Sequence, residues 1–141
     1  MIVSKGPATE RIPTVLYVED HPVNVRLMER LLARRGGVQL VAAATGRDAL
    51  QMAAVTRLDL VLLDLDLPDL PGEVVLERLW ALPGRQLVPV VVLTADALPE
   101  TEARLRGRGV SDHLTKPVDV ARLYACLDSV LAPAGTRDQA C

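Results

Sequence analysis

The chain has 141 residues, enough for one domain with a hydrophobic core and too few for two. Hydrophobic residues make up 50% of it and charged residues 24%, a composition typical of a globular domain and not of a disordered chain. Its 16 basic and 18 acidic residues leave a net charge of -2, which argues against a basic surface for nucleic-acid binding.

The sequence also lacks the features of exported and membrane proteins. No apolar run approaches the roughly 20 residues of a membrane span, and the first residues lack the hydrophobic stretch of a signal peptide. The two cysteines, Cys126 and Cys141, have neither a disulfide-framework spacing nor a metal-site spacing. We therefore expect a cytoplasmic protein with no membrane partner and no nucleic-acid partner.

Strands and helices are predicted to alternate five times. Short runs rich in valine and leucine predict strands, in chain order, at 14–18, 38–43, 58–63, 88–93 and 110–114. Helical spacing of apolar residues, with glycine or proline near many of the ends, predicts helices over 22–35, 45–55, 72–82, 99 to 107 or 109, and 118–131. The last helix carries the apolar residues Val120, Leu123, Leu127, Val130 and Leu131. This alternation predicts an α/β fold with a parallel sheet covered by helices on both sides.

Polar residues follow four of the predicted strands. Glu19-Asp20 comes after the first strand, Asp64 and Asp66 after the third, Thr94 after the fourth and Lys116 after the fifth. Because the carboxyl ends of parallel strands lie along one edge of the sheet, these side chains are expected to converge. Crowded carboxylates raise one another's pKa, and a hard cation such as Mg²⁺ relieves the repulsion. A lysine and a hydroxyl beside the cation complete a site for a phosphoryl group, where a carboxylate can act as nucleophile.

The order of these motifs resembles the receiver domain of response regulators in two-component signalling. The resemblance covers about Thr14 to Leu131 and rests on Glu19-Asp20, the loop from Asp64 to Gly72, Val92-Leu93-Thr94-Ala95, and Lys116-Pro117. It implies a flavodoxin-like, doubly wound (βα)5 fold with five parallel strands in the order 2-1-3-4-5. The stretch from Glu19 to Asn24 resembles the receivers attached to hybrid histidine kinases, except that His21 stands where asparagine is usual there.

The resemblance also implies a role for each site residue. Asp64 would accept a phosphoryl group from a phosphohistidine on a sensor histidine kinase or a histidine phosphotransfer protein. Thr94 and Lys116 would bind the phosphoryl oxygens, and their movement would signal the phosphorylated state. A Mg²⁺ or Mn²⁺ ion would be held by Glu19, Asp20, Asp64 and the backbone carbonyl of Asp66. The chain would be a regulatory phosphoacceptor that assists its own phosphotransfer and dephosphorylation, and not an enzyme.

Three departures from the family pattern bear on these roles. Pro71 stands before Gly72, where the family often has aspartate. Asp66 and Asp96 occupy the two variable positions that flank the attacking water in the family, so we expect both to modulate dephosphorylation. His113 stands where the family has an aromatic switch residue, and we hypothesise that its charge makes activation depend on pH between roughly pH 6 and 8.

Two other functions fit parts of the pattern. The Asp64-Leu65-Asp66 segment after a buried strand also resembles the first motif of haloacid-dehalogenase-like phosphatases, with Asp64 as nucleophile. Against this, Pro68 stands where that family expects threonine or valine, and the acidic pair Glu19-Asp20 precedes the motif. The third alternative is a pseudo-receiver, a binding module that keeps the fold without phosphorylation, although the intact acidic set argues against it.

The domain is expected to span residues 13–132, between a lead-in at 1–12 and a polar tail at 133–141. With so little chain after the last helix, we expect either a single-domain regulator or the receiver segment of a longer hybrid kinase. A homodimer can form through the fourth helix, the fifth strand and the fifth helix. Arg104, Arg106 and Arg108 on the fourth helix are a candidate partner surface, although a solvated helix face is the favoured interpretation.

Overall fold

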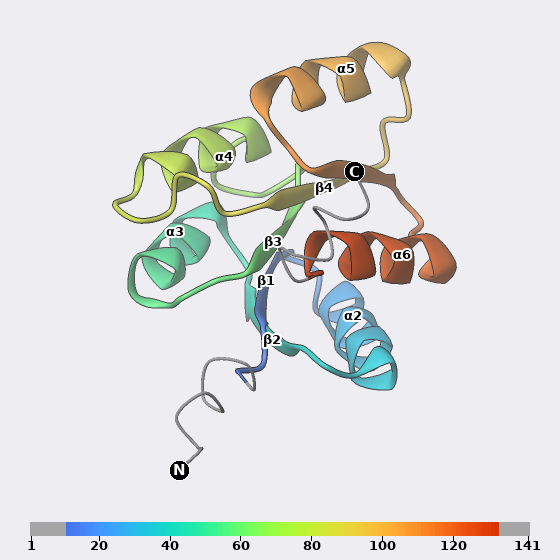
Figure 1. Cartoon of the computed structure of the whole chain (residues 1–141). Helices are drawn as coiled ribbons and strands as arrows, with labels where there is room; N and C mark the ends of the chain where they lie inside the picture. Colours follow the sequence, from blue (N-terminus) through green and yellow to red (C-terminus); the bar gives the residue numbers. More distant parts are fainter. Residues whose placement is uncertain (1–10, 133–141) are drawn as a thin grey trace.

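The computed structural model describes residues 11–132; most of the predicted lead-in and the whole predicted tail lie outside them. Within this part of the chain, strands and helices alternate as β1 Thr14–Val18, α2 Pro22–Arg35, β2 Gln39–Ala43, α3 Gly46–Val55, β3 Leu60–Asp64, α4 Gly72–Ala81, β4 Val90–Thr94, α5 Pro99–Arg108, β5 Asp112–Thr115 and α6 Val120–Val130. The strands form one parallel sheet in the order β2-β1-β3-β4-β5 (Figure 1). The predicted fold class and strand order are therefore confirmed.

The strands β3, β4 and β5 each begin two residues later than predicted. For β3 and β4, the residue before the strand accounts for the later start. Asp59 precedes β3 and lies in a bend, where its carboxylate accepts hydrogen bonds from the Thr14 backbone N–H and from Arg11 while its own N–H donates to the Thr14 carbonyl. Pro89 precedes β4 and has no N–H to contribute to a strand ladder. The last helix also begins two residues late, because Asp119 is its N-cap and accepts from the backbone N–H groups of residues 121 and 122.

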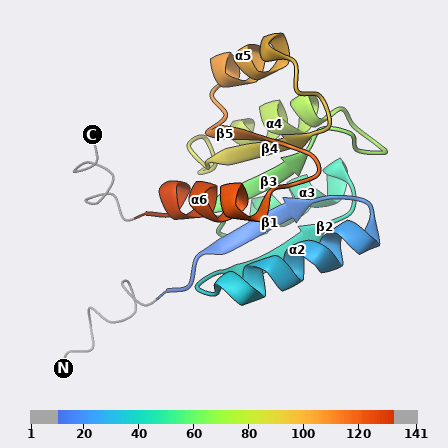
Figure 2. The same cartoon turned by 90° about the vertical axis from the view of Figure 1, so that its right-hand side faces the viewer.

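Helices cover both faces of the sheet, and alternate strand residues point to opposite sides (Figures 1 and 2). Toward α2 and α6 the sheet contributes Val15, Tyr17, Leu60, Leu62, Val91, Leu93 and Leu114. Toward α3, α4 and α5 it contributes Leu16, Val18, Val61, Leu63, Val90 and Val92. The strands β1, β3 and β4 are buried on both faces. This packing fixes the positions of their carboxyl ends relative to one another along one edge of the sheet.

Trp80, the only tryptophan of the chain, connects α4 to the region where α5 ends. Its indole Nε1 donates a hydrogen bond of 2.9 Å to the Val88 carbonyl. A Cβ atom placed on Gly109 would lie 3.5 Å from the indole ring. Gly109 caps α5 with φ +109°, in the left-handed region that favours glycine.

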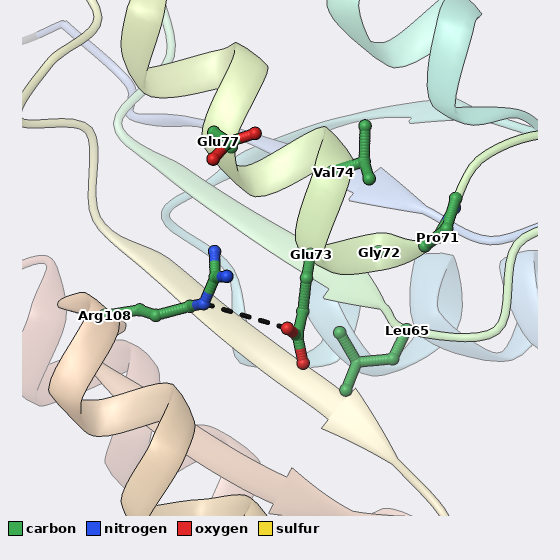
Figure 3. A pocket seen from close by; sticks show the side chains of 7 residues that line it. All are labelled: Leu65, Pro71, Gly72, Glu73, Val74, Glu77 and Arg108. Atoms are coloured by element: carbon green, nitrogen blue, oxygen red, sulfur yellow. Dashed lines mark ion pairs between the residues drawn. The ribbon is translucent and has the colours of Figure 1, made fainter.

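Helix α5 buries few of its residues, and its arginines form ion pairs on the surface. Only Thr101 and Leu105 of this helix are buried. Glu73 on α4 pairs with Arg104 at 2.6 Å. It also pairs with Arg108 at 3.7 Å, as Figure 3 shows. Arg106 pairs with acidic groups on its own helix and on β5. The three arginines therefore form a solvated, ion-paired helix face, as the favoured interpretation expected.

Candidate functional site

Charged residues from three strand ends meet at the carboxyl edge of the sheet. Glu19 follows β1, Asp64 ends β3 and Lys116 follows β5. The Lys116 Nζ lies 2.9 Å from Asp64 Oδ2 and 3.2 Å from Glu19 Oε1. The two carboxylate side chains are 0% and 2% exposed, whereas the lysine keeps 26% of its side chain in contact with solvent. One partly exposed cation thus bridges two buried anions.

Glu19 is fixed by three donors. Besides Lys116, the Tyr17 hydroxyl donates to Oε1 at 3.1 Å and the His21 backbone N–H donates to Oε2 at 3.2 Å. Burial alone would raise the pKa of Glu19, but the His21 hydrogen bond and the charge of Lys116 outweigh it and hold the pKa below its usual value. Glu19 is therefore ionised in the folded protein at neutral pH.

Asp64 accepts hydrogen bonds from fewer donors than Glu19 does, so its burial is less fully compensated. Its Oδ1 accepts a hydrogen bond of 3.0 Å from the Asp66 backbone N–H, and its Oδ2 accepts from Lys116. Burial raises the pKa of Asp64 above its usual value. The two donors do not offset this effect, and the negative charge of the nearby Glu19 raises the pKa further. Burial acts to lower the pKa of Lys116, yet the two carboxylates raise it above the usual value.

Asp20 supplies an oxygen that no group of residues 11–132 satisfies. Its Oδ1 is buried and has no hydrogen-bond partner in the described part of the chain. One ligand atom from each of Glu19, Asp20 and His21 lies within 4.8 Å of the others. Buried carboxylate oxygens without donors fit a hard cation such as Mg²⁺, which prefers oxygen ligands. Of the predicted metal ligands, Asp66 lies in the loop after Asp64 with its side chain exposed.

Thr94 and Asp96 lie at the end of β4. Thr94 is buried; its carbonyl accepts from the Lys116 backbone N–H at 2.8 Å, and its hydroxyl oxygen accepts from the Asp96 N–H at 3.1 Å. The Asp96 carboxylate accepts from the Leu98 backbone and, at 2.7 Å, from the Thr101 hydroxyl. Asp96 thereby organises the start of α5 in addition to its predicted place beside the site.

His113 on β5 is buried, with 6% of its surface exposed. Its Nε2 atom has no hydrogen-bond partner in the described residues, and its carbonyl accepts from Arg122. A cavity beside it is lined by charged side chains from α5, from the segment after β5 and from α6: Glu102, Lys116, Asp119 and Arg122. A buried ring with a free nitrogen at this position differs from the hydrocarbon ring that the family pattern prefers.

Three contributors to the site were absent from the sequence-based assignment. The Tyr17 hydroxyl and the His21 backbone both bind Glu19. Asp69, for which the sequence favours a loop or cap carboxylate, accepts hydrogen bonds from the first turn of α3. An aspartate in a loop after a strand carries no signal that tells which helix it will cap, so this contact needed the structure.

None of the helices in residues 11–132 is both long enough and apolar enough to cross a membrane. Residues 15–128 match the model of the response regulator receiver domain family. The chain is 36% identical over 115 residues to the signal transduction histidine-protein kinase BarA of Escherichia coli (strain K12), covering 81% of this chain and 12% of that protein.

Other similar proteins resemble the chain over nearly their whole length. It is 31% identical over 121 residues to the polar-differentiation response regulator DivK of Brucella anthropi, covering 86% of this chain and 98% of DivK. The receiver domain of the sensor histidine kinase PA1611 from Pseudomonas aeruginosa PAO1, with a magnesium ion coordinated in its active-site cleft, gives a TM-score of 0.77 at 32% identity. That match covers 87% of this chain and 100% of that domain. The chain thus spans a small part of BarA-type kinases and nearly all of DivK.

Proposed function

Because the chain belongs to the response regulator receiver family of two-component signalling, we propose that Asp64 accepts a phosphoryl group from a phosphohistidine on a sensor histidine kinase or histidine phosphotransfer protein. The observation that carries this proposal is the buried Asp64 carboxylate, bridged to Glu19 by Lys116. Burial without full compensation keeps Asp64 reactive, while the lysine supplies positive charge next to the attacked phosphorus.

The transfer proceeds as a displacement at phosphorus. A carboxylate oxygen of Asp64 attacks the phosphorus atom, the phosphorus–nitrogen bond of the donor breaks, and its electron pair returns to the imidazole. The product is an acyl phosphate on Asp64. Lys116 moves from the carboxylate to the phosphoryl oxygens, and the Thr94 hydroxyl donates a hydrogen bond to one of them. The Lys116 backbone N–H donates a hydrogen bond to the Thr94 carbonyl. The two residues therefore move together when the phosphoryl group is bound.

Receivers of this family bind Mg²⁺ at the acidic site, and here Glu19, Asp20, Asp64 and the Asp66 carbonyl would hold it, or Mn²⁺ in its place. The bound ion neutralises charge on the transferred group. The unpartnered Asp20 Oδ1 supports this assignment, because a buried carboxylate oxygen without a donor is costly unless a cation satisfies it.

We expect Mg²⁺ to stabilise the folded protein through this site. At about 100 times its dissociation constant, the ion should raise the free energy of unfolding by about 2.7 kcal/mol. Asp20→Asn should abolish most of this gain, because it removes the charge of the unpartnered oxygen. Urea unfolding with and without Mg²⁺ measures the effect, and Asp128→Asn, on an exposed face of α6, is the matched control. Equal gains in the two variants would remove Asp20 from the ligand set.

The donor protein is proposed to dock on the apolar surface beside the site. Val23 and Leu27 on α2 are 67% and 54% exposed, and Val120 on α6 is 39% exposed. The groove between these helices also reaches Lys116 and Pro117, so a protein seated there brings its phosphohistidine to the site. This surface fits a helical donor domain with an apolar face.

The test of the proposed function is phosphoryl uptake by the wild-type chain. Incubation with acetyl phosphate and Mg²⁺ should add one phosphoryl group that is lost on hydroxylamine treatment, as expected of an acyl phosphate. Chelation of Mg²⁺ should prevent the uptake. The same samples tested with p-nitrophenyl phosphate separate the alternatives. Multiple turnover would favour the haloacid-dehalogenase-like phosphatase, and no labelling at all would favour the pseudo-receiver.

His113 is proposed as the switch residue that responds to Thr94, with a pH dependence that a hydrocarbon ring lacks. Its buried, unpartnered Nε2 supports this proposal, and the neighbouring charged groups are Asp96, Glu102, Lys116, Asp119 and Arg122. Activation measured at pH 6 and pH 8 should differ in the wild type and agree in His113→Phe. An identical pH profile in both proteins would contradict the proposal.

The remaining proposals concern the setting of the domain. We propose that it acts in the cytoplasm, either alone or as the receiver of a hybrid kinase, and that Asp66 and Asp96 set the lifetime of the phosphorylated form. The surface of α5, β5 and α6 is proposed to contact the downstream target or a second copy of the chain. Exchange of the side chains at 66 and 96 for uncharged ones, followed by measurement of phosphoryl loss, tests the lifetime.

A further inference from the structure

The loop between β3 and α4, residues 65–71, determines where the groups around Asp64 lie. Its first residues include Asp66, whose backbone N–H binds the Asp64 carboxylate at 3.0 Å. Its ends are closed by a hydrogen bond of 3.2 Å from the Gly72 N–H to the Leu65 carbonyl. Figure 3 shows Leu65 beside the start of α4, where a Cβ on Gly72 would lie 2.7 Å from the Leu65 Cα. The base of the loop is thus closed by direct backbone contact.

The far side of the loop is fastened to a different helix by Asp69. Its Oδ1 accepts from the Gly46 backbone N–H at 2.8 Å and its Oδ2 accepts from the Arg47 backbone N–H at 2.9 Å. Both donors belong to the first turn of α3, where backbone N–H groups lack partners within the helix. These two bonds lower the pKa of Asp69 against the effect of its partial burial, so the carboxylate is charged at neutral pH.

Helix α3 does not need Asp69 for an ordinary N-cap. Thr45 already occupies the cap position, and its hydroxyl oxygen accepts from the Asp48 N–H at 3.0 Å. The contact is also close: a Cβ on Gly46 would lie 2.7 Å from a Val75 methyl group and 3.3 Å from the Asp69 carboxylate. The start of α3 is therefore shaped to receive the loop.

We propose that Asp69 is a positioning residue, which fixes the loop and with it the amide and carbonyl of Asp66 relative to the Asp64 carboxylate. The inference rests on the proposed function, in which that carbonyl binds Mg²⁺. The loop has a fixed base at Leu65 and Gly72, and the Asp69 bonds to α3 are its second attachment. Loss of the second attachment leaves the loop free to move about its base, so the carbonyl spends less time in the geometry that a small, strongly directional cation needs.

The experiment compares Asp69→Ala with Thr45→Ala, which removes a cap from the same helix without touching the loop. Calorimetric titration gives the Mg²⁺ affinity of each folded variant, and acetyl phosphate labelling gives its rate of phosphorylation. We expect Asp69→Ala to weaken Mg²⁺ binding by about tenfold, the effect usual for residues that orient metal ligands. Thr45→Ala should stay within twofold of the wild type in both measurements, although its stability falls.

Asp69→Asn keeps one acceptor oxygen, so its Mg²⁺ affinity should lie between those of the wild type and Asp69→Ala. If Asp69→Ala does not fold, Asp69→Asn is used in its place. If the Asp69 and Thr45 variants bind Mg²⁺ equally well, Asp69 is only a helix cap. That result overturns the positioning role of Asp69 and leaves the proposed phosphoacceptor function unaffected. A wild type that binds Mg²⁺ but takes no phosphoryl group overturns the proposed function and leaves the Mg²⁺ comparison to decide on Asp69.

Discussion

Replacement of Asp64 by asparagine should abolish phosphoryl uptake from acetyl phosphate while leaving the domain folded and, at pH 7, more stable than the wild type. Uptake is lost because the amide oxygen is a far weaker nucleophile than the carboxylate. Side-chain volume is nearly unchanged, and an amide oxygen can still accept from the Asp66 N–H. Mass spectrometry after incubation with Mg²⁺ and acetyl phosphate provides the first measurement.

The gain in stability follows from the raised pKa of Asp64. A group whose pKa is raised in the folded state costs stability once the pH lies above that pKa, since its charged form is disfavoured by burial. The advantage of asparagine should therefore be largest at pH 7 and vanish below the pKa of an unfolded aspartate, about 3.9. The control Asp128→Asn should be labelled like the wild type. Labelling that persists in Asp64→Asn would show that the phosphoryl group goes to another residue.

Replacement of Lys116 by methionine should have the opposite effect on stability and slow phosphorylation. It leaves Glu19 and Asp64 buried without their cation. Removal of one partner from a fully buried pair costs about 3–5 kcal/mol; with the lysine 26% exposed we expect about 2 kcal/mol at pH 7. Loss of one donor to the transferred group should slow uptake by about 100-fold. Urea unfolding and labelling time courses measure the two effects.

The pH dependence of the Lys116 effect has a defined sign. The raised pKa of Lys116 means that its contribution is present below the unfolded value of 10.5 and is lost at higher pH. The lowered pKa of Glu19 means that its contribution is present above the unfolded value of 4.5 and is lost as the pH falls. The cost of Lys116→Met should thus be largest between these limits and shrink at pH 4. Lys116→Arg keeps the charge and should lose less stability; equal losses would show that packing, not charge, is responsible.

The sheet could be predicted because its inner strands are buried on both faces and read as nearly unbroken apolar runs. The polar residues that end those runs lie at the same edge of a parallel sheet, so the meeting of Glu19, Asp64 and Lys116 followed from topology. Strand starts were less predictable. Leu58 and Val88 are apolar and buried, yet Asp59 and Pro89 delay pairing until Leu60 and Val90.

Contacts that depend on packing between separate elements were not predictable. Val120 is one of the apolar residues of α6 but is 39% exposed, because it is the first residue of that helix and lines the open groove beside Pro117. The hydrogen bond from Tyr17 to Glu19 is a different case, because it joins two residues of one strand end that alternation alone places on the same side of the sheet. The hydrogen bonds of Asp69 to α3 join residues far apart in sequence, and no local pattern encodes them.

The position of Trp80 gives this domain an internal optical probe. Its indole donates a hydrogen bond to the Val88 carbonyl and lies beside the glycine that ends α5, where an added Cβ would be 3.5 Å from the ring. No second tryptophan contributes to the emission of the chain. A shift of α5 would change the surroundings of that ring and hence its fluorescence. Movement of this helix, which buries few of its residues, can therefore be followed in solution without a label, during titration with a phosphoryl donor or with salt.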